Sequence, residues 1–182
     1  MNDSELVQRV KEGDADAFAV LLHRHKGALY PYIVSRVKDE AAACDIFQEV
    51  FIRVLKHIDN YEEMEKFRAW LFRIATNITM DHFRRQAKSA TVFSREMPET
   101  DRLESPEKTP EENAVNRETS KELKVAIDML SDEQKEIFLL REFSGLSFRE
   151  IAGIKGISVG AALTRMSRAT TKLRGLMREC HE

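Results

Sequence analysis

Apolar residues recur every three or four positions through nearly the whole chain, and this helical period limits the possible folds more than any other feature. Almost no window shows the sustained alternation of apolar and polar residues that is typical of half-buried strands. Glycine and proline are sparse, at 7 and 4 of 182 residues, so few positions interrupt the period. The sequence therefore predicts an all-α fold.

One segment breaks the period and divides the chain. The stretch "SREMPETDRLESPEKTPEEN" holds three of the four prolines and almost no large apolar residue. From Glu96 to Glu122, nine acidic and four basic residues leave a net charge of −5. This composition is typical of a solvated, extended linker. We expect two small helical domains, residues 1–90 and 118–182, joined by an acidic flexible linker over residues 91–117.

Composition excludes several classes of protein. The 29 basic and 31 acidic residues give a net charge of only −2, so a nucleic-acid surface has to be local. The N-terminus "MNDSELVQRV" lacks a signal pattern, and no stretch approaches the roughly 18 consecutive apolar residues of a membrane span. Cys44 and Cys180 belong to no Cys or Cys/His array. We expect a cytoplasmic protein without direct membrane insertion, bound metal or cofactor.

The first half predicts four helices. Two are separated around Gly13 and Asp14, with Asp16 as the expected N-cap of the second, which Pro31 should kink or restart. The third, from about Glu40 to Ile58, has an apolar face at helical spacing. Its members are Phe47, Val50, Phe51, Val54 and Ile58.

The other side of this third helix permits two interpretations. Asp45, Gln48, Glu49 and Ile52 share a stripe, which is either a solvated face with one stray isoleucine or a docking face for a partner. Its two carboxylates have no histidine, nucleophile or glycine-rich loop nearby in sequence, so they are a weak signal for an enzyme. Cys44, beside the stripe, is either a redox switch or a buried thiol; free cysteine is usually buried, which favours the second.

The fourth helix, "KFRAWLFRIATNITMDHFRRQ", is apolar on most sides but carries a polar stripe of Arg73, Asn77, Asp81 and Arg84. From Lys66 to Lys88 there are six basic residues and one acid, with aromatic residues between them. Basic groups beside aromatic rings suit single-stranded nucleic acid. The alternative is a buried helix whose surface is solvated and carries ion pairs such as Asp81 with Arg85.

The second half contains two capping boxes and two glycine stops around a tight turn. After a first helix from Leu123 to Leu130, Ser131 with Gln134 is predicted to start a second helix that ends at Gly145. Ser147 with Glu150 is predicted to start a third helix that ends at Gly156, and Ser158 is the expected N-cap of the last helix. A helix, a turn containing glycine and a second helix form the helix-turn-helix pattern.

The last helix concentrates positive charge. Residues 163–178 hold five basic residues and no acid, while a predicted inward face keeps the three/four rhythm. That face comprises Val159, Ala162, Met166, Ala169, Leu173 and Leu176. The helix is therefore either a DNA-recognition helix that enters the major groove or a basic solvated helix of an unrelated bundle.

These residues resemble the extracytoplasmic-function (ECF) sigma factors, the smallest members of the sigma-70 class of bacterial RNA polymerase. The stretch "LSDEQKEIFLLREFSGLSFREIAGIKGISVGAALTRMSRA" is similar to region 4 of that family. "KEGDADAFAVLLHRH", "DIFQEVFIRVLKHI" and "FRAWLFRIATNITMDHFRRQ" are similar to region 2. The resemblance covers both halves and leaves only the linker and termini unassigned.

The resemblance implies a role for each group of residues. It implies that the stripe Asp45, Gln48, Glu49 and Ile52 binds the polymerase clamp helices, and that Phe67 and Trp70 are structural. Implied contacts to the −10 element are made by Asn60, Tyr61, Lys66, Arg73, Asn77, Arg84 and Arg85. Implied contacts to the −35 element are made by Ser158, Leu163, Thr164, Arg165, Ser167, Arg168 and Lys172.

One departure affects the −35 reading. Where the family commonly has "VGTVKSR", this chain has "VGAALTR", so Ala161 replaces a threonine and Leu163 a usually basic residue. One DNA contact is then missing, or Leu163 instead touches a thymine methyl group.

The function implied is binding rather than catalysis. As a sigma factor, the chain would dock on core RNA polymerase, read promoter DNA at two elements, help to open the −10 strand, and be held by an anti-sigma factor. Two linked weak readers need not bind strongly alone. A stand-alone helix-turn-helix regulator is the rival interpretation; it would explain residues 123–182 but leave the stripe at Asp45 without a purpose.

Overall fold

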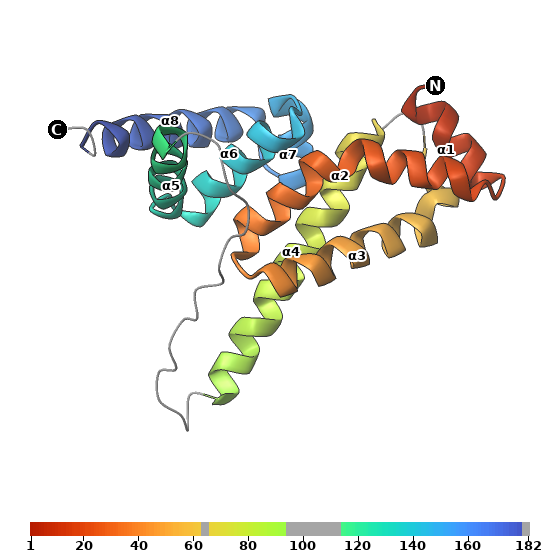
Figure 1. The fold of residues 1–182 in the computed structure, drawn as a ribbon, viewed down its shortest axis with the longest axis horizontal. Coiled ribbons are helices and arrows are strands. Elements are labelled where there is room, and N and C mark those ends of the chain that lie inside the picture. Colours follow the sequence, from red (N-terminus) through yellow and green to blue (C-terminus); the bar gives the residue numbers. More distant parts are fainter. Residues whose placement is uncertain (63–65, 94–113, 180–182) are drawn as a thin grey trace.

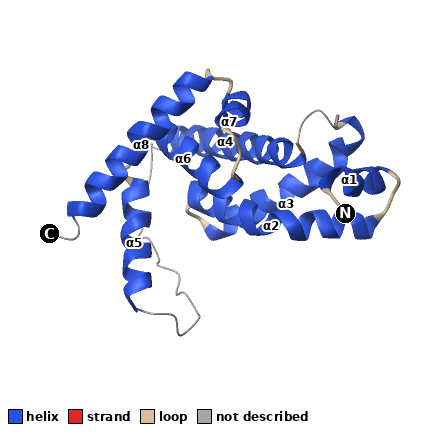
Figure 2. Cartoon of the chain, turned by 90° about the horizontal axis from the view of Figure 1, so that it is seen from above, coloured by secondary structure: helices blue, strands red, loops and turns tan. Residues whose placement is uncertain are grey.

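A computed structural model describes residues 1–62, 66–93 and 114–179, and throughout these ranges the regular structure is helical. Figures 1 and 2 show the helices as one elongated body, with the C-terminal end of α8 far from the N-terminus. The elements are α1 (Asp3–Lys11), α2 (Ala15–Val37), α3 (Glu40–His57), the 3-10 turn η1 (Ile58–Asn60), α4 (Phe67–Phe93), α5 (Ala114–Asp128), α6 (Asp132–Ser144), α7 (Phe148–Lys155) and α8 (Val159–Glu179). The all-α prediction is confirmed.

Helices α1, α2 and α3 begin at side-chain caps. Asn2 and Glu5 form a capping box on α1, and Asp39 accepts a hydrogen bond from the Ala42 N–H at the start of α3. The predicted cap of α2 was wrong by two residues, because the carboxylate that accepts from the first free N–H groups belongs to Asp14 rather than Asp16.

The predicted restart at Pro31 was also wrong, because α2 continues through it to Val37. Proline inside a helix costs about 3 kcal/mol. Leu29, Tyr32 and Ile33 on either side are fully buried, and each such side chain stabilises the fold by about 1.5–3 kcal/mol. Burial of these residues therefore outweighs the lost hydrogen bond.

Helices α2, α3 and α4 enclose the N-terminal core. The predicted inner face of α3 is confirmed: Val50, Phe51, Val54 and Ile58 are buried, and Phe47 is packed against them. Phe67 and Trp70 of α4 pack their rings against each other and belong to this core, so they are structural, as predicted.

The caps of the second half are where the sequence places them. Ser131 with Gln134 and Ser147 with Glu150 form complete capping boxes on α6 and α7. Gly145 and Gly156 end these helices in the left-handed conformation, at φ of 64° and 63°, which glycine adopts without steric cost. Two predictions differ: α5 begins at Ala114 rather than near Leu123, and Val159, expected inside, is exposed.

The two halves share one core. α6 packs along α2, and both α6 and α7 pack against α4. Ile137, Leu140 and Ile151 belong to the same buried apolar cluster as Leu29 and Ile33. Most of the predicted linker, residues 94–113, lies outside the described residues; its two ends continue α4 and begin α5.

A buried hydrogen bond joins α2 to α4, and its removal tests this packing. The Tyr32 hydroxyl lies 3.0 Å from the Thr76 hydroxyl, and both side chains are buried. We expect Tyr32→Phe to lower the free energy of unfolding by about 1 kcal/mol, because the Thr76 hydroxyl loses its partner. Urea denaturation measures the change. Tyr30→Phe, at a partly exposed tyrosine of the same helix, is the control and should change stability by less than about 0.5 kcal/mol; equal effects would contradict the account.

Candidate nucleic-acid interface

The helix-turn-helix is built from α7, a short turn and α8. Gly156 ends α7, and the Ser158 hydroxyl accepts a hydrogen bond from the Ala161 N–H at 3.1 Å, so Ser158 is the N-cap that the sequence predicts. Ala162 and Ala169 on α8 are fully buried, and Leu173 nearly so. This packing turns the opposite face of α8 toward solvent.

That outer face presents most of the side chains predicted to read the −35 element. Six of the seven are exposed, and Arg165 is the exception; the six are Ser158, Leu163, Thr164, Ser167, Arg168 and Lys172. The Thr164 hydroxyl already donates to the Gly160 carbonyl at 2.9 Å, which leaves its oxygen lone pair and its methyl group for contacts outward. Leu163 is 48% exposed, so an apolar side chain stands on a polar surface at the position where the family commonly has a basic one.

Two of the predicted −35 residues have partners within the protein. Arg165 is partly buried and forms an ion pair with Glu133 of α6 at 3.0 Å. Lys172 donates to the Met129 carbonyl at the C-terminal end of α5. Both cations therefore have to leave or share these partners to reach a phosphate.

The residues predicted to read the −10 element lie around the turn between α3 and α4 and along α4. Asn60 and Lys66 are exposed on either side of residues 63–65, which lie outside the described residues. Tyr61 differs from them because it is only 7% exposed and packs its ring against Trp70, with 4.9 Å between ring centroids. Its ring is therefore part of the core, and its backbone carbonyl accepts a hydrogen bond from Lys11.

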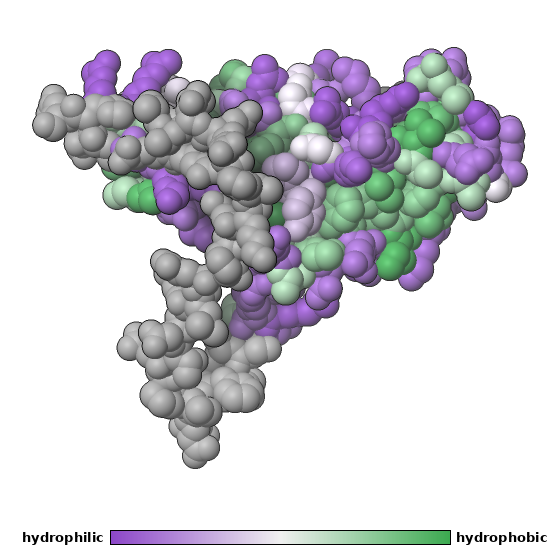
Figure 3. Space-filling model, viewed as in Figure 1, coloured by the Kyte–Doolittle hydropathy of each residue, from purple (hydrophilic) through white to green (hydrophobic). Residues whose placement is uncertain are grey.

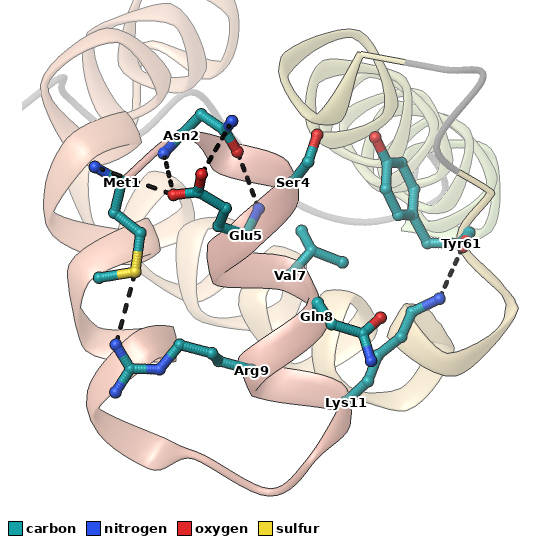
Figure 4. A pocket seen from close by; sticks show the side chains of 9 residues that line it. All are labelled: Met1, Asn2, Ser4, Glu5, Val7, Gln8, Arg9, Lys11 and Tyr61. Atoms are coloured by element: carbon teal, nitrogen blue, oxygen red, sulfur yellow. Dashed lines mark hydrogen bonds and ion pairs between the residues drawn. The ribbon is translucent and has the colours of Figure 1, made fainter.

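Helix α1 fixes the start of this turn, as Figure 4 shows. The Lys11 ammonium lies 2.8 Å from the Tyr61 carbonyl oxygen and 6.0 Å from the centre of its ring, beside a pocket of about 590 Å³. At its other end, α1 is tied to α2 through Asp3, which pairs with Arg24 and with His25. Burial lowers the pKa of His25, although the Asp3 carboxylate opposes the shift. The sequence did not single out Lys11.

Along α4, the predicted polar stripe has an exposed end. Asn77, Arg84 and Arg85 are exposed, and Arg73 is partly buried. Asp81 pairs with Arg84 at 3.5 Å, so the exposed pair holds one of the predicted DNA-contacting arginines at the surface.

The predicted polymerase-docking stripe lies on the outer face of α3. Asp45 and Gln48 are exposed, Glu49 pairs with Arg53 at 2.8 Å, and Ile52 is 45% exposed. Leu55, three positions further along, is 46% exposed, so Ile52 is not a single stray apolar residue. The three/four spacing of the stripe, continued by three positions from Ile52, would have identified Leu55 from the sequence. In the view of Figure 3, hydrophobic side chains gather over α2 and α3.

Cys44 corrects one expectation. Its side chain is exposed rather than buried, because it lies on the outer side of α3, where the Gln48 amide is 3.7 Å from its sulfur. Cys180 lies outside the described residues.

No group of three or more His, Cys, Asp or Glu side chains suited to a metal ion occurs among the residues that the structure describes. Within the same residues, no helix is both long and apolar enough to span a bilayer.

Two family models match the chain. Residues 21–89 match the model described as Sigma-70 region 2, and residues 120–173 match the model described as Sigma-70, region 4. The first match contains α3 and the exposed end of α4, and the second contains the helix-turn-helix.

Curated relatives align with nearly the whole chain. The ECF RNA polymerase sigma factor SigW of Bacillus subtilis is 33% identical over 179 residues, which cover 95% of each protein. The ECF RNA polymerase sigma-E factor of Escherichia coli is 31% identical and covers 93% of this chain and 91% of its own. BldN of Streptomyces coelicolor is 34% identical over 95% of this chain, which spans 65% of the length of BldN.

Two solved structures resemble the whole arrangement of helices. CnrH, in complex with the cytosolic domain of CnrY, has a TM-score of 0.72 at 26% identity and covers 97% of both chains. The sigma factor RpoE of Bartonella quintana, in complex with the anti-sigma factor NepR, has a TM-score of 0.72 at 25% identity and covers 88% of this chain and 96% of its own. With both regions matched in order and relatives aligned over nearly all its length, this chain belongs to the sigma-70 family, among the ECF RNA polymerase sigma factors.

Proposed function

We propose that the chain docks on core RNA polymerase through the outer face of α3 and reads a promoter with both halves. The observation that carries this proposal is the pairing of two different exposed surfaces on one chain. One is the acidic and apolar face of α3, and the other is the basic, capped recognition helix α8. A free-standing DNA-binding protein has no use for the first surface.

The proposed division of labour follows the domain bounds expected from sequence. Residues 1–90 would bind the polymerase and the −10 element, residues 118–182 would bind the −35 element, and residues 91–117 would link them. Lys66, Asn77, Arg84 and Arg85 offer cations and an amide to melted DNA, which suits single-strand binding. Tyr61 would act through its backbone and its packing, since its ring is buried.

Arg168 and Ser167 stand exposed on α8, where side chains reach base edges and phosphates. Leu163 would give an apolar contact to a thymine methyl group at this surface. Binding alone accounts for these surfaces, so the protein is proposed to act without catalysis and without a cofactor, in the cytoplasm with the polymerase.

An anti-sigma factor is the proposed regulatory partner. RpoE was solved in a complex with the anti-sigma factor NepR, and CnrH was solved with the cytosolic domain of CnrY. A partner of the same class would cover the polymerase-docking or DNA-reading surfaces described above.

The polymerase-docking face is tested by truncating its apolar side chain. We expect Ile52→Ala to weaken binding to core polymerase by about tenfold or more, because burying this side chain contributes roughly 1.5–3 kcal/mol. Fluorescence titration with labelled protein and no DNA measures the affinity. Val159→Ala removes an exposed apolar side chain from α8 and should leave the affinity within about twofold; equal losses would reject α3 as the docking face.

The −10 assignment separates a sigma factor from a stand-alone regulator. We expect Asn77→Ala combined with Arg84→Ala to reduce run-off transcription by about tenfold while core binding stays unchanged, because the loss falls on contacts to the opened strand. Gel filtration with core polymerase measures the binding. Normal transcription by the double variant would contradict the assignment of α4.

The −35 assignment predicts a base-specific loss at α8. We expect Arg168→Ala to weaken binding of the polymerase complex to its promoter about tenfold or more, the range of one good base contact. Lys121→Ala on α5 removes an equal charge from an exposed position and should change binding less than threefold. An equal loss of promoter binding in both variants would show that the effect depends only on net charge, and would contradict the assignment of Arg168.

A further inference from the structure

Helix α1 takes part in none of the surfaces proposed above, although it lies beside the turn between α3 and α4. The match to Sigma-70 region 2 begins at residue 21, whereas α1 ends at Lys11. α1 packs along α2 and also against η1, the 3-10 turn that follows α3. A helix in contact with a proposed DNA-reading turn can determine where the side chains of that turn stand.

The Lys11 side chain bonds to the backbone at the first end of the turn. Its ammonium donates to the Tyr61 carbonyl oxygen at 2.8 Å, and a charged donor makes the stronger kind of hydrogen bond. Lys11 is half-buried, so salt screens this bond less than a fully exposed one. In Figure 4 the dashed line from Lys11 crosses from α1 to the turn, while the other dashed lines join residues 1–9 to one another.

The rest of Tyr61 is fixed at the same place. Its ring centroid lies 4.9 Å from that of Trp70 and 6.0 Å from that of Phe67, and its N–H donates to the Ile58 carbonyl at 3.1 Å. The ring, the N–H and the carbonyl of one residue are therefore all held. Asn60, the residue before it, is exposed and is one of the proposed contacts to the −10 element. Its side chain is presented from a backbone with little freedom.

The other end of the turn is held from the same helix. Asp3 of α1 lies 2.9 Å from Nε2 of His25, and the His25 ring lies 5.2 Å from the ring of Phe67, the first residue of α4. Lys66, directly before Phe67, is a second proposed contact to the −10 element. α1 therefore supports both ends of the turn, directly through Lys11 and indirectly through His25.

The second cation of α1 cannot replace Lys11. The Nε of Arg9 donates to the Asp14 carboxylate at 2.7 Å, which ties this side chain to the start of α2. The simpler explanation of the Lys11 bond is that it only stabilises α1. A bond with that role alone affects every promoter equally, because it changes only the amount of folded protein. A bond that positions Asn60 also changes the preference for one base over another.

We propose that Lys11 is a positioning residue for promoter recognition. By holding the Tyr61 carbonyl it sets where Asn60 stands, and it thereby contributes to the choice of base in the −10 element without touching DNA itself. This inference rests on the proposed function, and its test has to distinguish the two.

Lys11→Met tests this role, because methionine keeps an apolar stem and removes the donor. Run-off transcription with core polymerase is measured on a fragment carrying the chain's own upstream region and on fragments with one changed base in the −10 element. We expect the wild-type chain to prefer the unchanged element by about fivefold or more at a base that is read. Lys11→Met should lower this preference by about threefold or more, and leave the preference among −35 elements unchanged.

The preference is a ratio of two transcripts made by the same protein sample, so a loss of folded protein cancels. Lys11→Arg should keep the wild-type preference, since a guanidinium also donates to a carbonyl. Lys26→Met removes the same charge from an exposed position of α2 and should leave the preference unchanged.

A double variant locates the effect at Asn60. We expect Asn60→Ala to lower the preference as well, and Lys11→Met combined with Asn60→Ala to lower it no further, because both changes act through the same side chain. Losses that multiply in the double variant would show that Lys11 acts elsewhere and would contradict the positioning of Asn60.

The outcomes separate the inference from the proposed function. If Lys11→Met transcribes less from every fragment but keeps its preference among −10 elements, Lys11 only stabilises the fold and the positioning role is wrong. An equal change of preference in Lys26→Met would overturn it too. A wild-type chain that gives no transcript with core polymerase, or that shows no preference among −10 elements, would overturn the proposed function and the inference with it.

Discussion

The packing of α6 against α2 is the contact on which the rest of the structure depends. It joins the apolar residues of two separately capped helical units into one core and determines which charged surfaces face water. The outer faces of α3 and α8 remain exposed. Lys66 and Arg165 are instead paired with carboxylates inside the protein. Both cations are among the residues proposed to contact DNA, so part of the proposed DNA-binding charge is already paired.

The proposed functional surfaces lie on three separate helices rather than in one cavity. α3 offers carboxylates next to Ile52 and Leu55, the end of α4 offers Asn77 and two arginines, and α8 offers a polar and basic face. Each surface is small, so each is expected to bind weakly alone. A polymerase that holds both halves raises their effective concentration along one DNA molecule, which suits two weak readers.

The sequence predicted what depends on local chemistry and missed what depends on distant contacts. The capping boxes at Ser131 and Ser147 and the glycine stops were correct, because each involves residues within a few positions of one another. A restart at Pro31 was predicted wrongly because the cost of proline is local, whereas the burial that offsets it comes from other helices. The partners of Lys38 and Lys66 lie more than 80 positions away, and no periodicity links them.

For the candidate site, the sequence predicted which faces are presented but not which side chains are free. Ile52 and Arg168 are exposed as their helical positions suggest, and the three/four period extends the α3 face to Leu55. Tyr61 is buried by contacts with Trp70, and Arg165 is engaged by Glu133. The most direct test of the central claim is gel filtration of the purified protein with core RNA polymerase, followed by run-off transcription on a fragment carrying its own upstream region. Co-elution with a specific transcript is predicted, whereas failure to co-elute, together with tight binding of duplex DNA by the protein alone, would contradict it.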